Sequence, residues 1–340
     1  MTFASDMLAI AIAAPGGPEM LVPTRTSLPA CGADDVLIRV AAAGVNGPDL
    51  AQRRGHYAPP PGASPLPGLE VAGEIVACGG DVSRFRPGDT VMALTNGGGY
   101  AEYVAVPHGQ VLPLPAGWTT LEAAALPETW FTITQALVMR AGLAPGMSVL
   151  VHGGAGGIGG AAIQIATLLG ARAIAVVSDD DKALYCRALG AIGIVNRTRE
   201  NLVERVMALT DGQGVDRVVD LVGGAMAAIN IEASARGGHI VQISTLEGGT
   251  ASVPLRQMMA KDLTLSGSTL RPQSARTKAA IAARIESDFL PALGAPGFAR
   301  PAITSVPLAA AAQAHVQLES RQHRGKLILV TAFGTGKSAS

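Results

Sequence analysis

The chain has 340 residues, and its 26 Lys and Arg residues balance 26 Asp and Glu residues, so the formal net charge is +0. A hydrophobic content of 48% and a charged content of 15% are typical of a folded globular protein, and this length is enough for two domains with sizeable cores. A neutral chain with 4% aromatic residues lacks the basic footprint of a nucleic-acid-binding protein, so we expect no nucleic-acid partner.

Two apolar segments invite a membrane interpretation, and we reject both. Residues Met1–Ala14 carry no Lys or Arg, whereas a secretory signal needs a positive start. The stretch Gly156–Val177 is interrupted by Gln164 and Arg172, which indicates a buried helix followed by a buried strand rather than a membrane span. The three cysteines form no C-x-x-C pair and predict neither a disulfide framework nor a zinc knuckle. We therefore expect a cytoplasmic protein.

The first third of the chain is rich in Gly, Pro and short β-like runs. The stretch Pro59–Pro67 contains too many prolines for regular structure and predicts a surface loop. These features favour a compact, mostly β domain of about 125 residues. The strands expected in it are 36–40, 71–77, 90–94 and 103–106.

From Leu121 onward, helical periodicity appears at 121–125 and 131–141, and strand and helix patterns then alternate. Six such strands predict a doubly wound parallel sheet. They are expected at 147–151, 172–177, 192–195, 215–221, 239–243 and 263–268. A helix at 275–285 and a closing strand at 326–330 return to the first domain, so the parallel sheet is inserted into it. A ligand site is expected in the cleft between the two domains.

The glycine-rich turn inside Val149–Gly159 carries the strongest functional signal. Gly154, Gly156 and Gly159 fit G-x-G-x-x-G between a predicted strand and a predicted helix at 158–169. Such a turn lets the backbone approach a pyrophosphate, which the helix-start N–H groups of Gly157 and Ile158 would bind. The alternative is a glycine turn in some other α/β unit.

Two further residues complete this dinucleotide pattern. Asp179 follows the next predicted strand, 20 residues after Gly159, where an acid contacts the ribose in dinucleotide-binding folds. His152 lies in the glycine loop itself and could contact the cofactor.

Several segments together resemble one family, the zinc-free quinone oxidoreductases of the medium-chain dehydrogenase/reductase superfamily, in its zeta-crystallin-like branch. The likeness runs from about residue 8 to residue 330. It is carried by Val45-Asn46 with Asp49 and by the segments 52–57, 59–64, 68–73, 98–103, 124–129 and 267–271.

The resemblance implies an α/β protein in which a GroES-like, mostly β catalytic domain surrounds a Rossmann domain. We place the catalytic domain at 1–128 and 273–334, the Rossmann domain at 129–272, and a disordered tail at 335–340. The resemblance also implies an enzyme with a nicotinamide cofactor, usually a homodimer or homotetramer, acting on a small-molecule quinone or enone.

Zinc is not expected. Zinc-dependent relatives place a Cys where this chain has Asn46 and a His where it has Leu69, and neither Asn nor Leu supplies the thiolate or imidazole that zinc prefers. Glu70 remains, and alone it is expected to bind backbone groups or pair with an arginine.

Without a Lewis acid, the protein must hold the acceptor against the nicotinamide and donate a hydrogen bond to the oxygen that gains charge. Tyr57 is the first candidate donor, because a hydroxyl with a pKa of about 10 donates without ionising. The alternative is an exposed or core tyrosine. Asn46 is the second candidate, since its amide could orient the ribose or the acceptor, with a simple turn residue as the alternative.

The resemblance also implies contacts to the nicotinamide end of the cofactor. Thr129 would face the ring, although it also suits a helix cap. Lys326 could reach the cofactor phosphates, with a solvated lysine as the alternative. Ser244 is expected at the carboxyl edge of the sheet, where ligands bind in such folds. The remaining contacts are the backbone groups of Ser268, Thr269 and Leu270.

The choice of coenzyme is finely balanced. The family usually prefers NADPH, and this chain keeps Lys182 while carrying Arg197, which could grip a 2′-phosphate. Asp179 would instead accept hydrogen bonds from ribose hydroxyls and favour NADH. The prediction is NADPH, with NADH as the alternative.

The predicted function is an NADPH-dependent reductase that transfers hydride to a quinone or activated enone without a metal. Two alternatives stay open. One is an enoyl-thioester or alkenal double-bond reductase, which the same fold would support. The other is a non-enzymatic cofactor-binding scaffold.

Overall fold

The computed structural model describes residues 5–336, and the chain divides into two compact units. Unit 1 is formed by the chain up to Phe131 together with the chain from Arg271 onward, and unit 2 is formed by Thr132–Leu270. The boundaries predicted from the sequence fall after residues 128 and 272, and most of the predicted tail, 335–340, lies outside the described residues.

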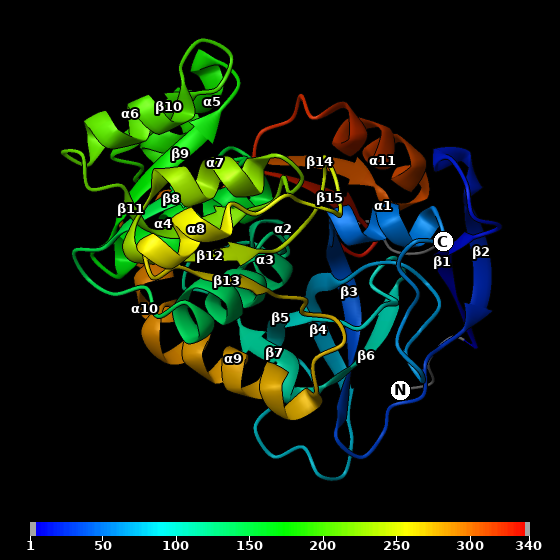
Figure 1. The fold of residues 1–340 in the computed structure, drawn as a ribbon. Helices are drawn as coiled ribbons and strands as arrows, with labels where there is room; N and C mark the ends of the chain where they lie inside the picture. The colour runs from blue at the N-terminus through cyan, green and yellow to red at the C-terminus, as the bar shows by residue number, and fades with distance from the viewer. Residues whose placement is uncertain (1–4, 337–340) are drawn as a thin grey trace. The chain divides into compact units, whose positions relative to one another are not determined.

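Unit 1 is built on a seven-stranded, mostly antiparallel sheet with a separate two-stranded hairpin (Figure 1). The sheet order is β14-β15-β3-β4-β5-β7, and β6 pairs with β3. Its strands are β3 (Asp35–Val45), β4 (Glu70–Cys78), β5 (Thr90–Leu94), β6 (Tyr103–Pro107), β7 (Val111–Pro113), β14 (Ile303–Pro307) and β15 (Lys326–Val330). The hairpin consists of β1 (Asp6–Ile12) and β2 (Leu21–Ser27).

The long strand β3 organises unit 1. It pairs with β4, β6 and β15, and its side chains Val36, Ile38 and Val40 are fully buried in the main hydrophobic cluster of the unit. Alternate apolar residues therefore hold β3 to the core while both of its edges are paired. The helices of unit 1 are α1 (Gly47–Arg53), α2 (Thr120–Ala123), α9 (Ala275–Asp288), α10 (Leu290–Leu293) and α11 (Ala311–Ser320). Helix α3 (Pro127–Ile133) begins in unit 1 and ends in unit 2.

Unit 2 is a six-stranded sheet in the order β10-β9-β8-β11-β12-β13, in which every neighbouring pair is parallel. Numbered within the unit, this order is 3-2-1-4-5-6, the Rossmann topology. The strands are β8 (Ser148–Val151), β9 (Arg172–Val177), β10 (Gly193–Asn196), β11 (Val215–Asp220), β12 (Ser234–Gln242) and β13 (Thr264–Gly267). The helices are α4 (Gly157–Leu168), α5 (Asp180–Ala188), α6 (Leu202–Leu209), α7 (Met226–Ala233) and α8 (Leu255–Ala260).

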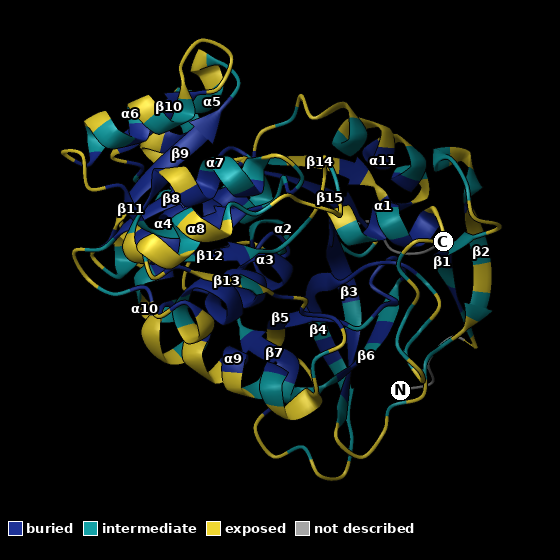
Figure 2. Cartoon of the chain, in the orientation of Figure 1, coloured by how far each residue is buried: buried dark blue, intermediate teal, exposed yellow. Residues whose placement is uncertain are grey.

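Burial follows this layering. Strand β8 is buried along its whole length, and β9 is buried from its second residue on (Figure 2). Because the carboxyl ends of parallel strands share one edge, the residues that follow β8, β9, β12 and β13 gather at that edge. Within residues 5–336, no helix has both the length and the apolar character needed to cross a membrane.

The predicted fold class, a GroES-like β domain with an inserted Rossmann sheet, is confirmed. Three predicted strands, at 90–94, 172–177 and 326–330, have the predicted bounds. Strands β1, β2, β7 and β14 were not predicted from the sequence. The prediction of one regular helix at 131–141 is wrong. Helix α3 ends at Ile133, and a π-helical segment, Thr134–Arg140, follows it.

The three motif glycines have different structural roles. A Cβ at Gly159 would lie 2.3 Å from the carbonyl oxygen of Gly153, and one at Gly154 would lie 2.8 Å from the Cβ of Ala175. A Cβ at Gly156 would meet only the oxygen of Gly153, at 3.4 Å. Gly154 and Gly159 therefore let helix and strand approach each other, whereas Gly156 borders open space.

This difference predicts opposite results for two matched substitutions. We expect Gly159→Ala to lower the free energy of unfolding by about 1–3 kcal/mol, because the methyl group overlaps backbone that cannot easily move. Gly156→Ala should change it by less than about 0.5 kcal/mol. Urea unfolding followed by circular dichroism measures both, and equal losses would contradict the assignment.

Candidate active site

A buried ion pair lies where three neighbouring strands of unit 1 come together. Lys326 begins β15, Asn46 follows β3, and Glu70 begins β4, and these strands are adjacent in the sheet order. The ammonium of Lys326 donates to Glu70 Oε1 at 2.5 Å and to Asn46 Oδ1 at 2.5 Å. The side chains of Lys326 and Glu70 are 4% and 0% exposed.

Each polar group of this ion pair is satisfied. Besides the ammonium, Glu70 Oε1 accepts from Asn46 Nδ2 at 2.8 Å, and Glu70 Oε2 accepts from the backbone N–H of Glu128 at 2.9 Å. The carbonyl oxygen of Val45 lies 3.4 Å from the ammonium. A buried pair with this many hydrogen bonds is geometrically fixed, because each ion would be costly without its partner.

The sequence-based expectations for these residues need correction. Lys326 is neither solvated nor free to bind phosphate, since three oxygens surround its ammonium. Glu70 binds backbone, as expected, but pairs with this lysine rather than with an arginine. Asn46 is more than a turn residue, because both ends of its amide belong to the ion pair.

The donor set does not fit a zinc ion. The oxygens of Asn46 and Glu70 are already bonded to the ammonium of Lys326, and Leu69 has no donor atom. Across residues 5–336, no group of three or more His, Cys, Asp or Glu residues is arranged to hold a metal ion.

Asp49 ties the segments that carry Asn46 and Glu70 together. Its Oδ2 accepts from the backbone N–H of Asn46 at 2.8 Å, and its Oδ1 accepts from the N–H of Gly68 at 3.0 Å. Burial raises the pKa of Asp49 to about 6, an effect that the two backbone N–H groups oppose. The start of α1 and the segment before β4 are thus joined through one carboxylate.

A chain of hydrogen bonds leads from Asp49 to the surface of unit 1. Arg53 NH1 lies 3.2 Å from His315 Nδ1 and can only donate, so the imidazole proton is on Nε2. That Nε2–H then donates to the Tyr100 hydroxyl at 3.1 Å, and the hydroxyl donates to Asp49 at 3.3 Å. Burial and the charge of Arg53 lower the pKa of His315 to about 3, so the ring is neutral, as this direction requires. Arg53 itself pairs with Glu319 at 2.5 Å.

Tyr57 is half-buried in the loop after α1, beside a firmly held arginine. The Arg271 guanidinium lies 5.5 Å from the centroid of the Tyr57 ring, within cation–π range. Arg271 in turn donates to Gln52 Oε1 at 2.8 Å and to the carbonyl oxygen of Asn96 at 2.9 Å. Burial, and next the charge of Glu128, raise the pKa of the Tyr57 hydroxyl, so it remains a neutral donor.

Sequence reasoning missed three ionisable residues of this cluster: Glu128, Arg271 and Lys278. Lys278 is 2% exposed and donates to Asn96 Oδ1 at 2.6 Å and to the carbonyl of Arg271 at 2.8 Å. Burial lowers the pKa of Lys278 to about 8. The only sequence signal for Glu128 was an acid within an otherwise apolar run at the start of a helix.

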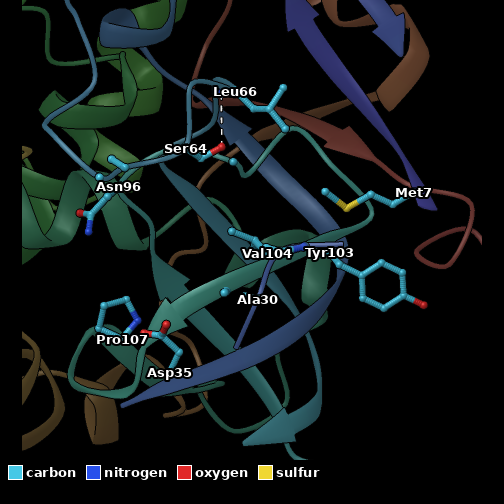
Figure 3. A pocket seen from close by; sticks show the side chains of 15 residues that line it. Met7, Ala30, Asp35, Ser64, Leu66, Asn96, Tyr103, Val104 and Pro107 are labelled. Carbon is cyan, nitrogen blue, oxygen red and sulfur yellow. Dashed lines mark hydrogen bonds between the residues drawn. The ribbon is translucent and has the colours of Figure 1, made fainter. Parts of the chain in front are cut away.

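A pocket of about 380 Å³ lies in unit 1 beside the Asn96 segment (Figure 3). The side chains labelled in it include Ser64 and Leu66 from the proline-rich loop, Asp35 from β3 and Tyr103 from β6. Asn96 lines this pocket and also accepts hydrogen bonds from Arg271 and Lys278, so it joins the pocket wall to the ionisable cluster.

In unit 2, the glycine turn has the geometry of a phosphate site. Gly156 precedes α4 with extended backbone angles, and Gly157 and Ile158 form the first turn of this 12-residue helix. The unpaired N–H groups and the partial positive charge at such a helix start favour a phosphate. The open space beside Gly156 is compatible with a pyrophosphate approaching the backbone.

The structure does not support the predicted cofactor contact of His152. The residue is 1% exposed, and its Nε2 lies 2.7 Å from Asn230 Oδ1, while Asn230 donates to Asp220 at 2.9 Å. The imidazole therefore belongs to a buried polar network of unit 2.

The residues predicted to read the coenzyme's ribose lie at the ends of β9 and β10. Asp179 accepts from the N–H of Lys182 at 2.9 Å, and its carboxylate lies 3.3 Å from the Lys182 ammonium. The N–H of Arg197 donates to the carbonyl of Val177 at 3.0 Å, which brings Arg197 beside this pair. Within the described part of the chain, the exposed Arg197 guanidinium has no hydrogen-bond partner. The site thus combines one carboxylate with two cations.

The residues predicted to contact the nicotinamide end of the cofactor lie at the ends of β12 and β13 and in α3. Ser244 follows β12, and Ser268 follows β13, so both lie at the carboxyl edge of neighbouring strands. The Ser268 hydroxyl donates to Gln135 Oε1 at 3.1 Å, and it is followed by Thr269 and the buried Leu270. Thr129 lies within the first turn of α3 and donates to the carbonyl of Leu126 at 3.1 Å, so it is not the helix cap.

Comparison with known proteins agrees with this architecture. Residues 32–116 match the family model described as an alcohol dehydrogenase GroES-like domain, and residues 157–285 match the model described as a zinc-binding dehydrogenase. The quinone oxidoreductase of Rattus norvegicus is 30% identical over 328 residues, which cover 95% of this chain and 98% of the rat protein.

Two solved structures share the fold over nearly the whole chain. An Escherichia coli quinone oxidoreductase complexed with NADPH is 27% identical, with a TM-score of 0.81 and coverage of 95% of this chain and 99% of that one. A protein described as an NAD-dependent alcohol dehydrogenase is 33% identical, with a TM-score of 0.81 and coverage of 95% and 99%.

A GroES-like unit interrupted by a Rossmann sheet is the architecture of the medium-chain dehydrogenase/reductases, a class of oxidoreductases. Within that class, the chain belongs to the quinone oxidoreductase family, as its near-complete alignment with members of that family shows. The predicted family is therefore confirmed, and the protein is an enzyme of the oxidoreductase type.

The ion pair at the centre of unit 1 yields a stability prediction. We expect Lys326→Met to lower the free energy of unfolding by about 3–5 kcal/mol, because it leaves the Glu70 carboxylate buried without a counter-charge. The double variant Lys326→Met/Glu70→Gln should recover part of that loss. Urea unfolding at neutral pH measures this, and a double variant no more stable than the single one would argue against the pair as the cause.

Proposed function

We propose that the enzyme is an NADPH-dependent reductase that transfers hydride to a quinone or activated enone without a metal. The observation that carries this proposal is the Lys326–Glu70–Asn46 cluster, because it engages the amide oxygen of Asn46, where zinc-dependent relatives carry a Cys, and the carboxylate of Glu70 beside Leu69. The quinone oxidoreductase family of its relatives supports the same class of acceptor.

A quinone or enone is electron-poor enough to accept hydride without a Lewis acid. The coenzyme, when bound, supplies that hydride. The chain's own contribution is to hold the acceptor and to donate a hydrogen bond to the oxygen on which charge develops. We assign the donation to Tyr57, because its hydroxyl is kept neutral. Asn46 instead positions the ion pair, since both ends of its amide are already engaged.

We propose that the coenzyme is held mainly by the carboxyl edge of the unit 2 sheet. The glycine turn and the start of α4 suit the pyrophosphate, because they offer unpaired N–H groups beside open space. His152 and Lys326 are not assigned to the coenzyme, because His152 is bound to Asn230 and Lys326 to Glu70 and Asn46. The residues assigned are Gly154, Gly156, Gly157 and Ile158 for the pyrophosphate, Asp179, Lys182 and Arg197 for the adenosine ribose, and Thr129, Ser244, Ser268, Thr269 and Leu270 for the nicotinamide end.

The structure offers a reason to prefer NADPH despite Asp179. The Asp179 carboxylate is bound by a backbone N–H, by the Ser178 hydroxyl at 2.8 Å and by the Lys182 ammonium, so its charge is partly compensated. Arg197 then remains to bind a 2′-phosphate with paired hydrogen bonds.

Replacing this arginine tests the coenzyme assignment. We expect Arg197→Ala to weaken NADPH binding about tenfold while leaving NADH binding within about twofold, because only NADPH carries the phosphate. Fluorescence titration with both reduced coenzymes measures the two dissociation constants. Arg199→Ala is the matched control, since Arg199 pairs with Asp180. A wild-type enzyme that binds NADH tenfold more tightly than NADPH would overturn the assignment.

The role of the Tyr57 hydroxyl is tested by replacing the tyrosine with phenylalanine, which removes the hydroxyl and keeps the ring. We expect Tyr57→Phe to lower kcat by about 10- to 100-fold, because a hydrogen bond to the developing charge is lost, while the coenzyme dissociation constant stays unchanged. Tyr185→Phe, on α5, serves as the control, because Tyr185 belongs to no part of the proposed site. Unchanged turnover in the Tyr57 variant would reduce Tyr57 to a packing residue.

The function itself is tested with a panel of acceptors. Purified enzyme is mixed with NADPH or NADH and with para- and ortho-quinones, 2-alkenals or crotonyl thioesters, and the loss of reduced-nicotinamide absorbance is followed. Faster reduction of quinones or simple enones than of thioesters is the expected result. A strong preference for crotonyl thioesters would favour the double-bond reductase instead, and no turnover with any acceptor would favour a cofactor-binding scaffold.

We further propose a homodimer in the cytoplasm. Among the described residues, β13 is an edge strand with β12 as its one sheet neighbour, and its other side can extend the sheet with a second copy. Nearby α8 exposes apolar side chains, with Leu255 66% and Met259 76% exposed. Sedimentation velocity measures the oligomeric state.

A further inference from the structure

Arg271 is a buried arginine whose guanidinium is held by neutral oxygens. The residue is 4% exposed. Its Nη1 donates to Gln52 Oε1 at 2.8 Å, and its Nε and Nη2 donate to the carbonyl oxygen of Asn96 at 3.1 and 2.9 Å. Because neither acceptor is a carboxylate, these bonds do not neutralise the cation. They bind a planar, rigid fork from two sides and therefore fix its orientation.

Both groups that hold the guanidinium are themselves fixed. Gln52, near the end of α1, donates to the carbonyl of Pro65 at 2.9 Å. Lys278 on α9 is 2% exposed and donates to Asn96 Oδ1 at 2.6 Å and to the carbonyl of Arg271 at 2.8 Å. Helix α1, the proline-rich loop, the Asn96 segment and α9 are thus joined around Arg271.

Tyr57 lies in a stretch of chain that is otherwise exposed. Gly55, His56 and Ala58 are exposed, whereas Tyr57 is partly buried. Among the described residues, no hydrogen bond holds the Tyr57 hydroxyl. The Arg271 guanidinium lies over the Tyr57 ring, 5.5 Å from its centroid, which is within the range of a cation–π interaction. A fixed group therefore supports the side chain of an otherwise exposed loop.

The charge of Arg271 also acts on the Tyr57 hydroxyl. Burial first, and the charge of Glu128 next, raise the pKa of this hydroxyl, whereas Arg271 lowers it. The direction agrees with the ring contact, because a nearby cation favours the phenolate. Arg271 therefore affects both where the ring lies and how readily its hydroxyl donates.

The position of Arg271 in the chain links it to the coenzyme segment. It is the residue at which the chain returns from unit 2 to unit 1. It directly follows Leu270, the last of the three residues that we assign to the nicotinamide end after β13. One peptide bond thus joins that segment to the arginine that contacts Tyr57.

We propose that Arg271 is a positioning residue that holds Tyr57 in the orientation in which its hydroxyl donates to the acceptor oxygen. This inference rests on the proposed function. Arg271 itself touches neither acceptor nor coenzyme in this scheme, and it acts through the Tyr57 ring. Orientation matters because a misplacement of about 1 Å in an active site can lower the rate about 100-fold.

A double-variant cycle separates positioning from a general structural role. We expect Arg271→Met to lower kcat about tenfold, because the Tyr57 hydroxyl is no longer held in line with the acceptor, while the coenzyme dissociation constant stays within about twofold. The double variant Arg271→Met/Tyr57→Phe should be no slower than Tyr57→Phe alone, since the hydroxyl that Arg271 positions is already absent. Steady-state turnover with NADPH and a quinone measures this. A further tenfold loss in the double variant would overturn the positioning role.

Arg271→Lys distinguishes fixed geometry from charge. A lysine keeps the positive charge but lacks the planar fork that binds Gln52 and Asn96 together. Its kcat should therefore stay close to that of Arg271→Met. Recovery of the wild-type kcat would show that charge alone is needed and would contradict the proposal.

The matched control is Arg300→Met. Arg300 belongs to the same unit and has the same kinds of contact, since it donates to Glu122 Oε1 at 2.7 Å and to the carbonyl of Gly117 at 2.8 Å. Its guanidinium lies 5.3 Å from the centroid of the Trp118 ring. It belongs to no part of the proposed site, so this variant should keep the wild-type kcat.

Fluorine NMR reports the contact without any turnover. Fluorotyrosine at the 4 tyrosines gives one resonance each, and the Tyr57 resonance is the one that is missing in Tyr57→Phe. We expect Arg271→Met to shift this resonance and to raise the pKa of its hydroxyl, because the neighbouring cation is gone, whereas Arg300→Met changes neither. Gln52→Leu removes one anchor of the guanidinium and should shift the same resonance, even if Arg271→Met does not fold.

The two measurements separate the inference from the proposed function. A Tyr57 resonance that keeps its position and its pKa in the Arg271 and Gln52 variants would overturn the inference. An enzyme that reduces no acceptor, but whose Tyr57 resonance responds as expected, would instead refute the proposed function and leave the contact between Arg271 and Tyr57 established.

Discussion

The ion pair between Lys326 and Glu70 is the constraint on which unit 1 depends. It joins the first residue of β15 to the first residue of β4 across the end of β3, so the positions of three strands are set by one buried cation. The same contact fixes Asn46 and receives the N–H of Glu128. Asp49 adds a second link by holding the N–H groups of Asn46 and Gly68. The ionisable groups of the site are therefore set within the sheet itself.

The two units differ in the kind of polar group that their secondary structure presents. In unit 2, helix starts and glycine backbone provide neutral N–H groups, which suit a phosphate-bearing ligand without burying any compensating charge. In unit 1, carboxylates and ammonium groups are buried together, and burial raises the pKa of Glu128 to about 8. The two units thus contain different kinds of polar group.

The sequence predicted those features that depend on local pattern. Strand β9 and strand β15 are continuous apolar runs, and the glycine turn has fixed spacing, so their positions and the fold class could be read directly. Strand β2 was missed because Pro23 and alternating polar residues hide it, and β14 because it is short and half-exposed. The helix predicted through residue 141 ignored the change to π-helical bonding, which has no local sequence signal.

The contacts of the site could not be predicted in the same way. Lys326 and Glu70 are 256 residues apart, and nothing local to either residue identifies its partner. His152 lies in the glycine motif, but its ring turns toward Asn230, 78 residues later. Tyr57 and Asn46 were recognised by family pattern, whereas Glu128, Arg271 and Lys278 become visible only when the strands bring them together.

The long sequence separation of the ion pair has a consequence for synthesis on the ribosome. Unit 2 is one continuous segment, so all of its strands have been made before the chain that completes unit 1. At a translation rate of roughly 5–20 residues per second, Lys326 is synthesised about 13–50 s after Glu70. During that interval the nascent β3–β4 pair carries an acid without its counter-charge, so the ion pair cannot form until β15 has been made. Synthesis of β15 is thus the event that completes the sheet of unit 1.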